Sequence, residues 1–245
     1  MTTTDLHAFL EGAVVEEAVA ALRPDYRALL LAVDGLQPED AGAPTDPATE
    51  AFLVDAEGSA RAALAAGPVE ELPHVAAWRE AYRAFGAKPQ RTRNSLEALL
   101  RRAGAGLPRV NRLTDVYNAV SVLHQLPLGG EDLQRYVGSP QLRRATGAET
   151  FDTAADGGPA VEHPEPGEVV WCDDAGVTCR RWNWRQGVRT RLTPSTTTAF
   201  FVLDALDPLT DAQLHAAADD LVEHLAPLGP DVSAVRRQVG RPPMN

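Results

Sequence analysis

An arginine- and tryptophan-rich run at residues 179–186 is enclosed by apolar segments typical of β-strands, and this arrangement constrains the fold most strongly. Residues 168–172 and 177–179 flank the turn-forming sequence Asp173-Asp-Ala-Gly176, which predicts an antiparallel hairpin. Residues 198–204 are rich in large apolar side chains and predict a buried strand. The run therefore emerges from a sheet rather than from a flexible tail.

Basic and aromatic side chains are concentrated in residues 180–191, a segment that contains no carboxylate. Flat aromatic faces beside guanidinium groups suit stacked nucleobases and phosphates. Two interpretations of the tryptophans stay open, because both would lie on one side of a strand and would either stack on a base or pack under a helix. The residues concerned are Arg180, Arg181, Trp182, Trp184, Arg185, Arg189 and Arg191.

Charge is distributed unevenly along the 245 residues, whose net charge is −11. Residues 1–78 carry three basic side chains against fourteen acidic ones, whereas residues 79–112 carry nine basic side chains against two acidic ones. A chain polarised in this way can present a basic face to a polyanion while its acidic remainder keeps it soluble. The alternative is that these arginines lie on ordinary solvated helix faces.

The composition also excludes several classes of protein. No apolar run approaches the roughly 20 residues of a membrane helix, and residues 1–6 lack the blocks of a secretory signal. We therefore expect a cytoplasmic protein with no membrane partner. Cys172 and Cys179 are expected to be buried thiols, with a cross-strand disulfide as the alternative. The scattered histidines show no zinc-ligand spacing, and we expect no metal or other cofactor.

The order of the predicted elements favours an α+β fold with a mostly antiparallel sheet. Helical spacing of apolar residues predicts helices at 6–22, 48–66, 69–84, 96–102, 112–124 and from 210 to near 229. A continuous apolar run predicts a strand at 26–34 that is covered on both faces. We expect an extended crossing at 88–93, a turn at 126–132, a hairpin formed by 141–146 and 149–153, and a loop at 154–167.

Four motifs together resemble a known family. They are Tyr82-Arg-Ala-Phe-Gly86, Asn111-Arg-Leu-Thr-Asp-Val-Tyr-Asn-Ala-Val-Ser121, Leu126-Pro-Leu-Gly-Gly-Glu-Asp132 and Arg180-Arg-Trp-Asn-Trp-Arg-Gln186. The chain resembles a freestanding B3/B4 protein, a module otherwise found as the editing domain of the phenylalanyl-tRNA synthetase β subunit. The resemblance spans roughly residues 70 to 204 and implies helices layered on a β-sandwich of unusual connectivity.

The resemblance also implies contact with an aminoacyl-tRNA, whose mischarged amino acid the synthetase module hydrolyses. Asp115, Val116 and Asn118 match the core of the synthetase pattern, but its histidine position falls on Gly129. The acidic residue of the synthetase pocket has no counterpart at residues 187–191. We expect three parts in one compact domain: an N-terminal segment at 1–69, a B3/B4-like core at 70–204, and a C-terminal helix and tail at 205–245.

Side chains with amide or guanidinium groups are the candidates for chemistry on an aminoacyl ester, which needs a positioned water and a stabilised oxyanion. The candidate catalytic residues are Asn118, Asn183 and Gln186. The candidate substrate-binding residues are Tyr82, Arg83, Arg180, Arg181, Trp182, Trp184 and Arg185. Each has a structural alternative; Asn118, for example, would simply bond to a neighbouring loop carbonyl.

Two functions follow as hypotheses. The first is a tRNA-interacting protein that binds the acceptor end and hydrolyses misacylated aminoacyl-tRNA in trans. The second is a catalytically inactive protein of the same fold that binds a free amino acid or related metabolite, which the glycine at the histidine position favours. A nonspecific RNA-binding accessory is a third, weaker hypothesis.

Overall fold

A four-stranded antiparallel sheet forms the centre of the computed structural model, which describes residues 3–40, 42, 44–155 and 157–241. Its order is β11 (Ser233–Gly240), β2 (Arg27–Asp34), β10 (Ala199–Ala205) and β3 (Leu128–Asp132). Alternate residues of β2 enter two different cores, Leu30 on one face and Leu29 on the other. Burial on both faces explains the uninterrupted apolar sequence of β2, and the buried strands predicted at 26–34 and 198–204 are confirmed.

A second, five-stranded sheet packs on one face of the central sheet. It contains β1 (Val14–Val15), β4 (Gln141–Arg144), β7 (Val169–Asp173), β8 (Gly176–Arg180) and β9 (Arg185–Gln186), in that order. Only the β1–β4 pair is parallel. A shared apolar core joins the two sheets, with Leu142 and Trp171 facing Leu30 and Phe200. A two-stranded ribbon, β5 (Phe151–Ala155) and β6 (Gly158–Glu162), lies beside β8.

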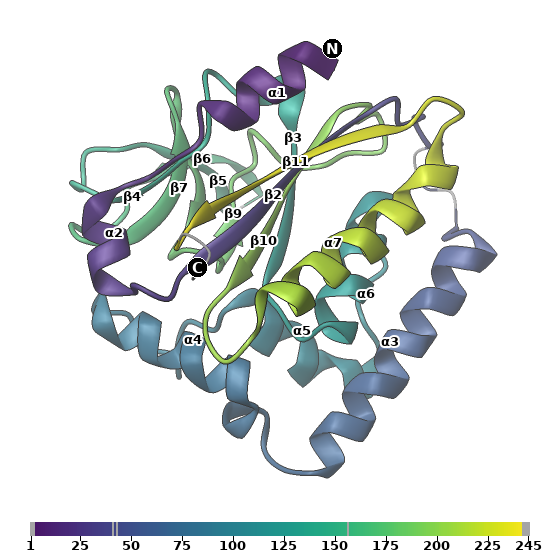
Figure 1. Ribbon diagram of the computed structural model, residues 1–245, viewed down its shortest axis with the longest axis horizontal. Coiled ribbons are helices and arrows are strands. Elements are labelled where there is room, and N and C mark those ends of the chain that lie inside the picture. Colours follow the sequence, from purple (N-terminus) through teal and green to yellow (C-terminus); the bar gives the residue numbers. More distant parts are fainter. Residues whose placement is uncertain (1–2, 41, 43, 156, 242–245) are drawn as a thin grey trace.

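Helices cover the other face of the central sheet (Figure 1). The first to contact it are α6 (Arg112–Leu123) and α7 (Asp211–Leu225), and α3 (Pro47–Ala65) and α5 (Ser95–Arg102) pack against α6. The remaining helices, α1 (Thr3–Glu11), α2 (Glu17–Leu22) and α4 (Pro73–Ala84), lie around the sandwich. Short 3₁₀ turns lie at 69–71, 103–105, 133–135 and 226–228. The expected α+β fold, with helices on a mostly antiparallel sandwich, is confirmed.

Two of the expected helices are interrupted. The helix predicted at 6–22 is two helices separated by β1, because the backbone around Val14 pairs with β4. Gly12 permits the break, since a Cβ there would lie 2.1 Å from Ser139 Oγ. The helix predicted at 69–84 begins as a 3₁₀ turn, and Pro73 opens the α-helix in the first-turn position that proline favours.

Several expectations for the sheets are wrong. The predicted turn at 126–132 contains β3, which pairs with β10. The predicted hairpin at 141–153 does not form, since β4 pairs with β7 and β5 pairs with β6 of the expected loop. Strand β11 was not expected at all and pairs with β2. The missed strands β3 and β11 are polar or rich in glycine and acquire their conformation from partners distant in sequence, whereas β6 pairs with the neighbouring β5.

The hairpin of β7 and β8 is confirmed, but its register does not place the two cysteines opposite each other. Cys172 lies opposite Val177, and Cys179 lies opposite Trp171 across a bulge, so the cysteines are not paired. Both are free, buried thiols. The segment at 88–93 is a turn rather than an extended crossing, because the amides of Arg91 and Thr92 both donate to the Lys88 carbonyl.

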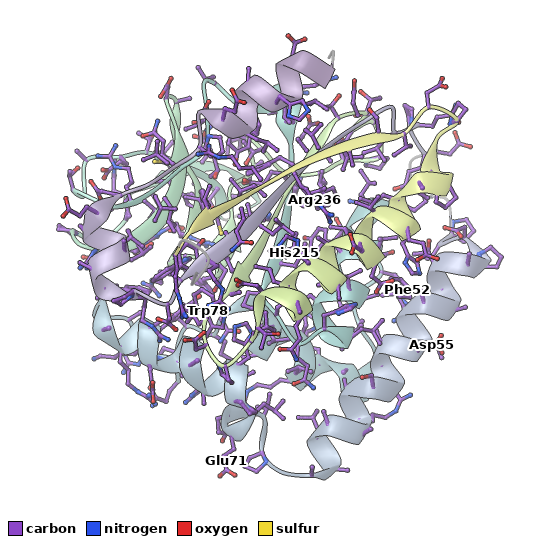
Figure 2. The ribbon with its side chains drawn as sticks, viewed as in Figure 1. Phe52, Asp55, Glu71, Trp78, His215 and Arg236 are labelled. Atoms are coloured by element: carbon purple, nitrogen blue, oxygen red, sulfur yellow. The ribbon has the colours of Figure 1, made fainter. Side chains whose placement is uncertain are left out.

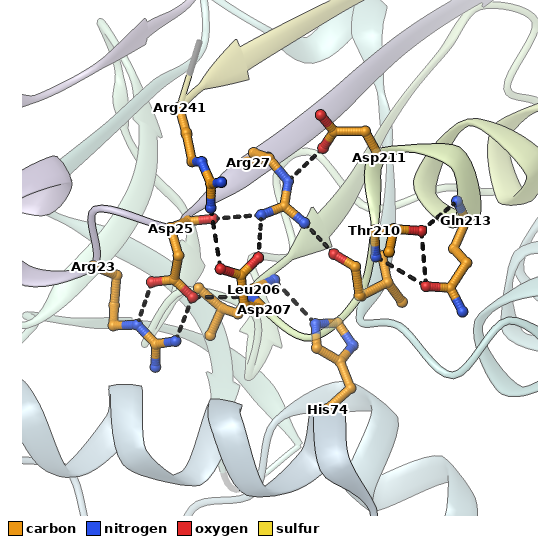
Figure 3. A network of polar contacts seen from close by, with 11 residues as sticks. Arg23, Asp25, Arg27, His74, Leu206, Asp207, Thr210, Asp211, Gln213 and Arg241 are labelled. Carbon is orange, nitrogen blue, oxygen red and sulfur yellow. Dashed lines mark hydrogen bonds and ion pairs between the residues drawn. The ribbon is translucent and has the colours of Figure 1, made fainter. Parts of the chain in front are cut away.

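A polar network holds the end of β10 against α4 and the start of β2 (Figure 3). The buried Arg27 guanidinium lies 3.0 Å from Asp207 Oδ1 and 2.7 Å from Asp211 Oδ1. His74 accepts the Leu206 amide at its Nε2, so its Nδ1 carries the proton and donates to the Gln125 carbonyl. Burial lowers the pKa of His74 to about 4, so the ring is neutral and bridges two backbones.

Large aromatic side chains fill the space between α4 and the sandwich. Trp78 of α4, labelled in Figure 2, is fully buried, and its ring centroid lies 5.3 Å from that of Trp182 and 6.4 Å from that of Tyr26. This contact fixes the segment after β8 in the interior. Among the described residues, no helix combines the length and apolar character required to cross a membrane.

Candidate functional site

The arginine- and tryptophan-rich run folds as a tight turn between β8 and β9. Arg181 and Trp182 adopt left-handed backbone angles, with φ of 48° and 69°, which reverse the chain. The Arg181 amide donates to Glu168 Oε1, and the Trp182 amide donates to the Val169 carbonyl. Because the run is not a strand, the expectation that both tryptophans share one strand face is wrong.

The two tryptophans have different environments. Trp182 is fully buried and packs edge-on against Tyr26 and Trp78, which is the core alternative. Trp184 is only half-buried, and three guanidinium groups lie over its ring, those of Arg181 at 4.6 Å, Arg185 at 4.7 Å and Arg180 at 5.9 Å from the ring centroid. The predicted stacking of arginine beside an aromatic face therefore occurs, but within the protein.

Carboxylates neutralise most of the arginines in this run. Arg180 is buried and donates to both oxygens of Glu168, at 2.9 and 2.8 Å, and also contacts Glu162. Arg185 pairs with Glu162 at 2.5 Å, and Arg189 pairs with Asp173 at 2.7 Å. The five arginines do not form one open basic face, because their partners come from β6, β7 and the loop at 163–168, which the sequence pattern did not bring together.

A cavity of about 250 Å³ lies between the two sheets and is walled by α5 and α6. It brings together the candidates Asn118, Asn183, Gln186, Trp182, Trp184 and Arg185. Four other candidates, Tyr82, Arg83, Arg180 and Arg181, are outside its lining. The remaining lining residues are Ser95, Ala98, Leu99, Arg102, Pro108, Tyr117, Leu128, Gly129, Glu131, Trp171, Cys179, Val202 and Asp204.

A buried carboxyl group, Asp204, lies at the cavity and was not among the candidates. Tyr26 Oη donates to its Oδ1 at 2.7 Å, and Asn183 Nδ2 donates to its Oδ2 at 3.1 Å. Tyr82 Oη in turn donates to Asn183 Oδ1 at 2.9 Å, so a hydrogen bond at each end of the Asn183 amide fixes it, and it positions Asp204. Burial raises the pKa of Asp204 to about 7, although both hydrogen bonds favour the charged form.

Glu131 is a second buried carboxyl group at the cavity. It accepts hydrogen bonds from the hydroxyls of Tyr136 and Thr190, and burial raises its pKa. No arginine, lysine or histidine among the described residues forms an ion pair with Glu131 or Asp204. Arg102 and Arg185 also line the cavity, but these two carboxyl groups have no ion-pair partner in the described part of the chain, which makes their ionised forms costly in a protein interior.

Gln186 occupies space made by the absence of a side chain at Gly129. A Cβ at Gly129 would lie 2.9 Å from Gln186 Nε2, and this nitrogen donates to the Gly130 carbonyl at 2.9 Å. The bond leaves the Gln186 carbonyl oxygen available to a ligand. The resemblance expects a histidine at position 129. In this chain the side-chain amide of Gln186, which comes from β9, occupies that space instead.

The Asn118 amide differs from the other two. It is buried at the cavity wall, and among the described residues no hydrogen bond engages it, so the alternative of a bond to a loop carbonyl does not hold. A signal for the missed residues was present in the sequence: Asp204 and Glu131 are carboxyl groups next to apolar or glycine segments that enter a sheet. Such placement marks a carboxyl group that cannot reach water.

This chain is similar in sequence to one protein family and to one tRNA ligase subunit. The family model described as the B3/4 domain matches residues 77–225, which is more than half of the chain. The phenylalanine–tRNA ligase β subunit of Mycoplasma genitalium is 34% identical over 96 residues, which cover 38% of this chain and 11% of that subunit. An N-terminal fragment of the phenylalanyl-tRNA synthetase β subunit from Pyrococcus horikoshii aligns with a TM-score of 0.45 at 12% identity. That alignment covers 91% of this chain and 53% of the fragment.

The chain therefore spans only a small part of the ligase subunit that it matches in sequence. Its match to the B3/4 model, in contrast, includes α5, α6, the turn at 181–184 and β10, which together build the cavity. This chain belongs to the B3/4 domain family.

Proposed function

We propose that this protein binds an aminoacyl-tRNA, holds its aminoacyl group in the cavity and hydrolyses the ester bond to the tRNA. The observation that carries the proposal is the cavity itself, where an unengaged amide, aromatic walls and two carboxyl groups with no ion-pair partner among the described residues meet in about 250 Å³. Membership of the B3/4 family and the likeness to a tRNA ligase subunit support tRNA as the carrier of the ligand.

The charges of the cavity favour a ligand with an ammonium group. Every aminoacyl ester carries such a group next to its carbonyl carbon. An ammonium group bound at Asp204 would supply the missing cation, and it would favour the ionised form of a carboxyl group whose pKa burial holds near 7. Trp171 and Val202 give apolar surface to the side chain of the amino acid.

The amides supply the groups that ester hydrolysis requires. A water oxygen attacks the ester carbonyl carbon, the bond to the ribose oxygen breaks, and the ribose oxygen takes up the proton that the water gives up, which leaves a free amino acid and a tRNA hydroxyl. In this proposal the Asn118 N–H groups donate to the oxyanion that develops on the carbonyl oxygen. The free carbonyl oxygen of Gln186 accepts from the attacking water and orients it, while Asn183 positions Asp204.

Incubation with a panel of misacylated tRNAs tests this function. We expect at least one aminoacyl-tRNA to lose its amino acid well above the rate in buffer, and Asn118→Ala to lower that rate by roughly 10²-fold or more if the amide stabilises the oxyanion. Correctly folded protein that accelerates no deacylation anywhere in the panel would exclude the proposed activity.

A second candidate function is a binding protein for a free amino acid, without catalysis. The specific observation in its favour is that ion pairs neutralise Arg180, Arg185 and Arg189, which removes the expected contact surface for phosphates. Titration calorimetry separates the candidates: tight binding of a free amino acid, combined with no affinity for tRNA at low salt, selects the binding protein.

A further inference from the structure

A depression of about 290 Å³ adjoins the cavity and carries cations that the arginine-rich run lacks. The turn at 85–92 forms one wall and residues 165–168 form the other, with Arg181 between them. Lys88 and Arg91 both line the depression and are both exposed. Neither forms an ion pair with any part of the chain that the structure describes. The ammonium charge of Lys88 and the guanidinium charge of Arg91 therefore remain uncompensated.

The backbone of this turn and the side chain of Thr92 are held in place. The amides of Arg91 and Thr92 donate to the Lys88 carbonyl, and Arg181 Nη1 donates to Thr92 Oγ1. Lys88 and Arg91 therefore project from an ordered turn instead of a free loop. Cations carried on an ordered backbone lose less conformational entropy on binding an anion than cations on a mobile segment do.

Two carboxylates also line the depression, and they do not cancel its charge. Glu168 is already paired with Arg180 at 2.8 Å and lies 3.5 Å from Arg181. Glu165 is the remaining carboxylate, against Lys88 and Arg91. The open part of the depression thus has an excess of positive charge, which suits a phosphate rather than a cation or an apolar ligand.

The depression and the cavity share a wall. Arg181 lines the depression and lies over the ring of Trp184, which lines the cavity. Ser95 begins α5, the helix that walls the cavity, and its amide donates to the Asn183 carbonyl. This bond joins the segment that follows the turn at 85–92 to the lining of the cavity. A polymer with phosphates in the depression can therefore place its terminal group in the cavity.

We propose that Lys88 and Arg91 bind phosphates of the single-stranded acceptor end of tRNA and lead its aminoacyl terminus into the cavity. The identity of the polyanion rests on the proposed function, whereas the location of its binding site rests on the ion-pairing pattern. The arginine-rich run, whose arginines already pair with Glu162 and Glu168 inside the protein, builds the wall between the two sites and does not supply the phosphate contacts.

Binding of an uncharged tRNA, measured by fluorescence anisotropy over a range of salt concentrations, tests this inference. The variant is Lys88→Ala/Arg91→Ala in the full chain. The matched control is Arg61→Ala/Arg135→Ala, which removes two exposed arginines away from both sites. We expect the first variant to bind tRNA about tenfold more weakly at low salt, with a slope of log affinity against log salt that is shallower by roughly 1.4, and the control to match the wild type.

The outcomes separate this inference from the proposed function. If the wild type binds tRNA and the Lys88→Ala/Arg91→Ala variant binds more weakly, the phosphate site stands even where no misacylated tRNA is hydrolysed. If the wild type deacylates a tRNA and this variant does so with unchanged kcat/KM and salt slope, the site is wrong and the activity stands. Wild-type protein that binds only inorganic phosphate, or no anion at all, would overturn the inference.

Discussion

Asp204 is the residue whose chemistry most directly sets the properties of the cavity. Its carboxyl group is held by Tyr26 and Asn183, has no cationic partner among the described residues, and titrates near neutral pH because it is buried. A group with a pKa of about 7 is divided between its charged and neutral forms under ordinary conditions. Binding of an ammonium group at this position must therefore depend on pH.

We expect the ratio of kcat/KM between wild type and Asp204→Asn to rise about tenfold from pH 6 to pH 8, since the ionised fraction of Asp204 rises about tenfold over that range. The sign follows from the charge: the carboxylate exists above the pKa, and only the carboxylate pairs with an ammonium group. The substrate's own amino group also titrates and opposes this rise, so its ammonium fraction at each pH is measured separately and divided out of the ratio. A ratio that is constant across this range would show that Asp204 does not bind the ammonium group.

Arg180 and Arg185 provide a second test at the level of single residues. Arg180→Ala leaves Glu168 buried without its main partner and is expected to destabilise the fold by about 3–5 kcal/mol. Arg185 and Glu162 are each more than a third exposed, so Arg185→Ala is expected to cost about 1 kcal/mol or less. Urea unfolding measures both; equal losses of stability would contradict the structural role assigned to Arg180.

At the scale of secondary-structure elements, local sequence patterns predicted those helices and strands whose conformation depends on nearby residues. Strands β2 and β10, the β7–β8 hairpin and the helices at 48–66, 112–124 and from 210 follow from apolar spacing and turn residues. Strands β3, β6 and β11 do not: β3 and β11 are polar or contain glycine and pair with strands distant in sequence, whereas β6 pairs with the neighbouring β5 but lies in a segment rich in glycine and proline. The two glycines of β3 predicted a turn. Gly130 instead lies in a strand, where a glycine is required because a Cβ would lie 2.7 Å from the Phe201 ring.

The candidate site was predictable to the same extent. Asn118, Asn183 and Gln186 were found from motifs, and the cavity brings all three together. Asp204 looked like the polar end of a strand. The neutralising partners of the arginines, Glu162 and Glu168, lie in or beside segments expected to be loop, so their pairing depends on tertiary structure alone.

The central sheet also bears on where the folding unit begins and ends. Strand β2 from the first 69 residues lies between β10 and β11, outside the B3/4 match at 77–225. We propose that the three expected segments fold as one unit, and we expect a chain that begins at residue 70 to lack native near-ultraviolet circular dichroism and cooperative unfolding. A stable, cooperatively folded truncation would instead make residues 1–69 a separate part.

For the whole molecule, we propose two tasks for two adjoining sites. The exposed turn at 88–91 would bind the polyanion, and the cavity would receive its terminal group. The acidic remainder of the chain, which brings the net charge to −11, opposes binding of nucleic acid elsewhere on the surface. Recognition of tRNA and chemistry on its aminoacyl group should therefore be separable by mutation.

The most direct test of the cavity's role is the deacylation rate of a misacylated tRNA with the variant Ala98→Trp. Ala98 lines the cavity from α5, so an indole there fills space that the aminoacyl group needs, whereas Ala105→Trp adds the same group at an exposed position outside the cavity lining. We predict that Ala98→Trp abolishes deacylation while tRNA affinity is retained, and that Ala105→Trp behaves as the wild type. Full deacylation by folded Ala98→Trp protein would contradict the assignment of the cavity as the site of hydrolysis.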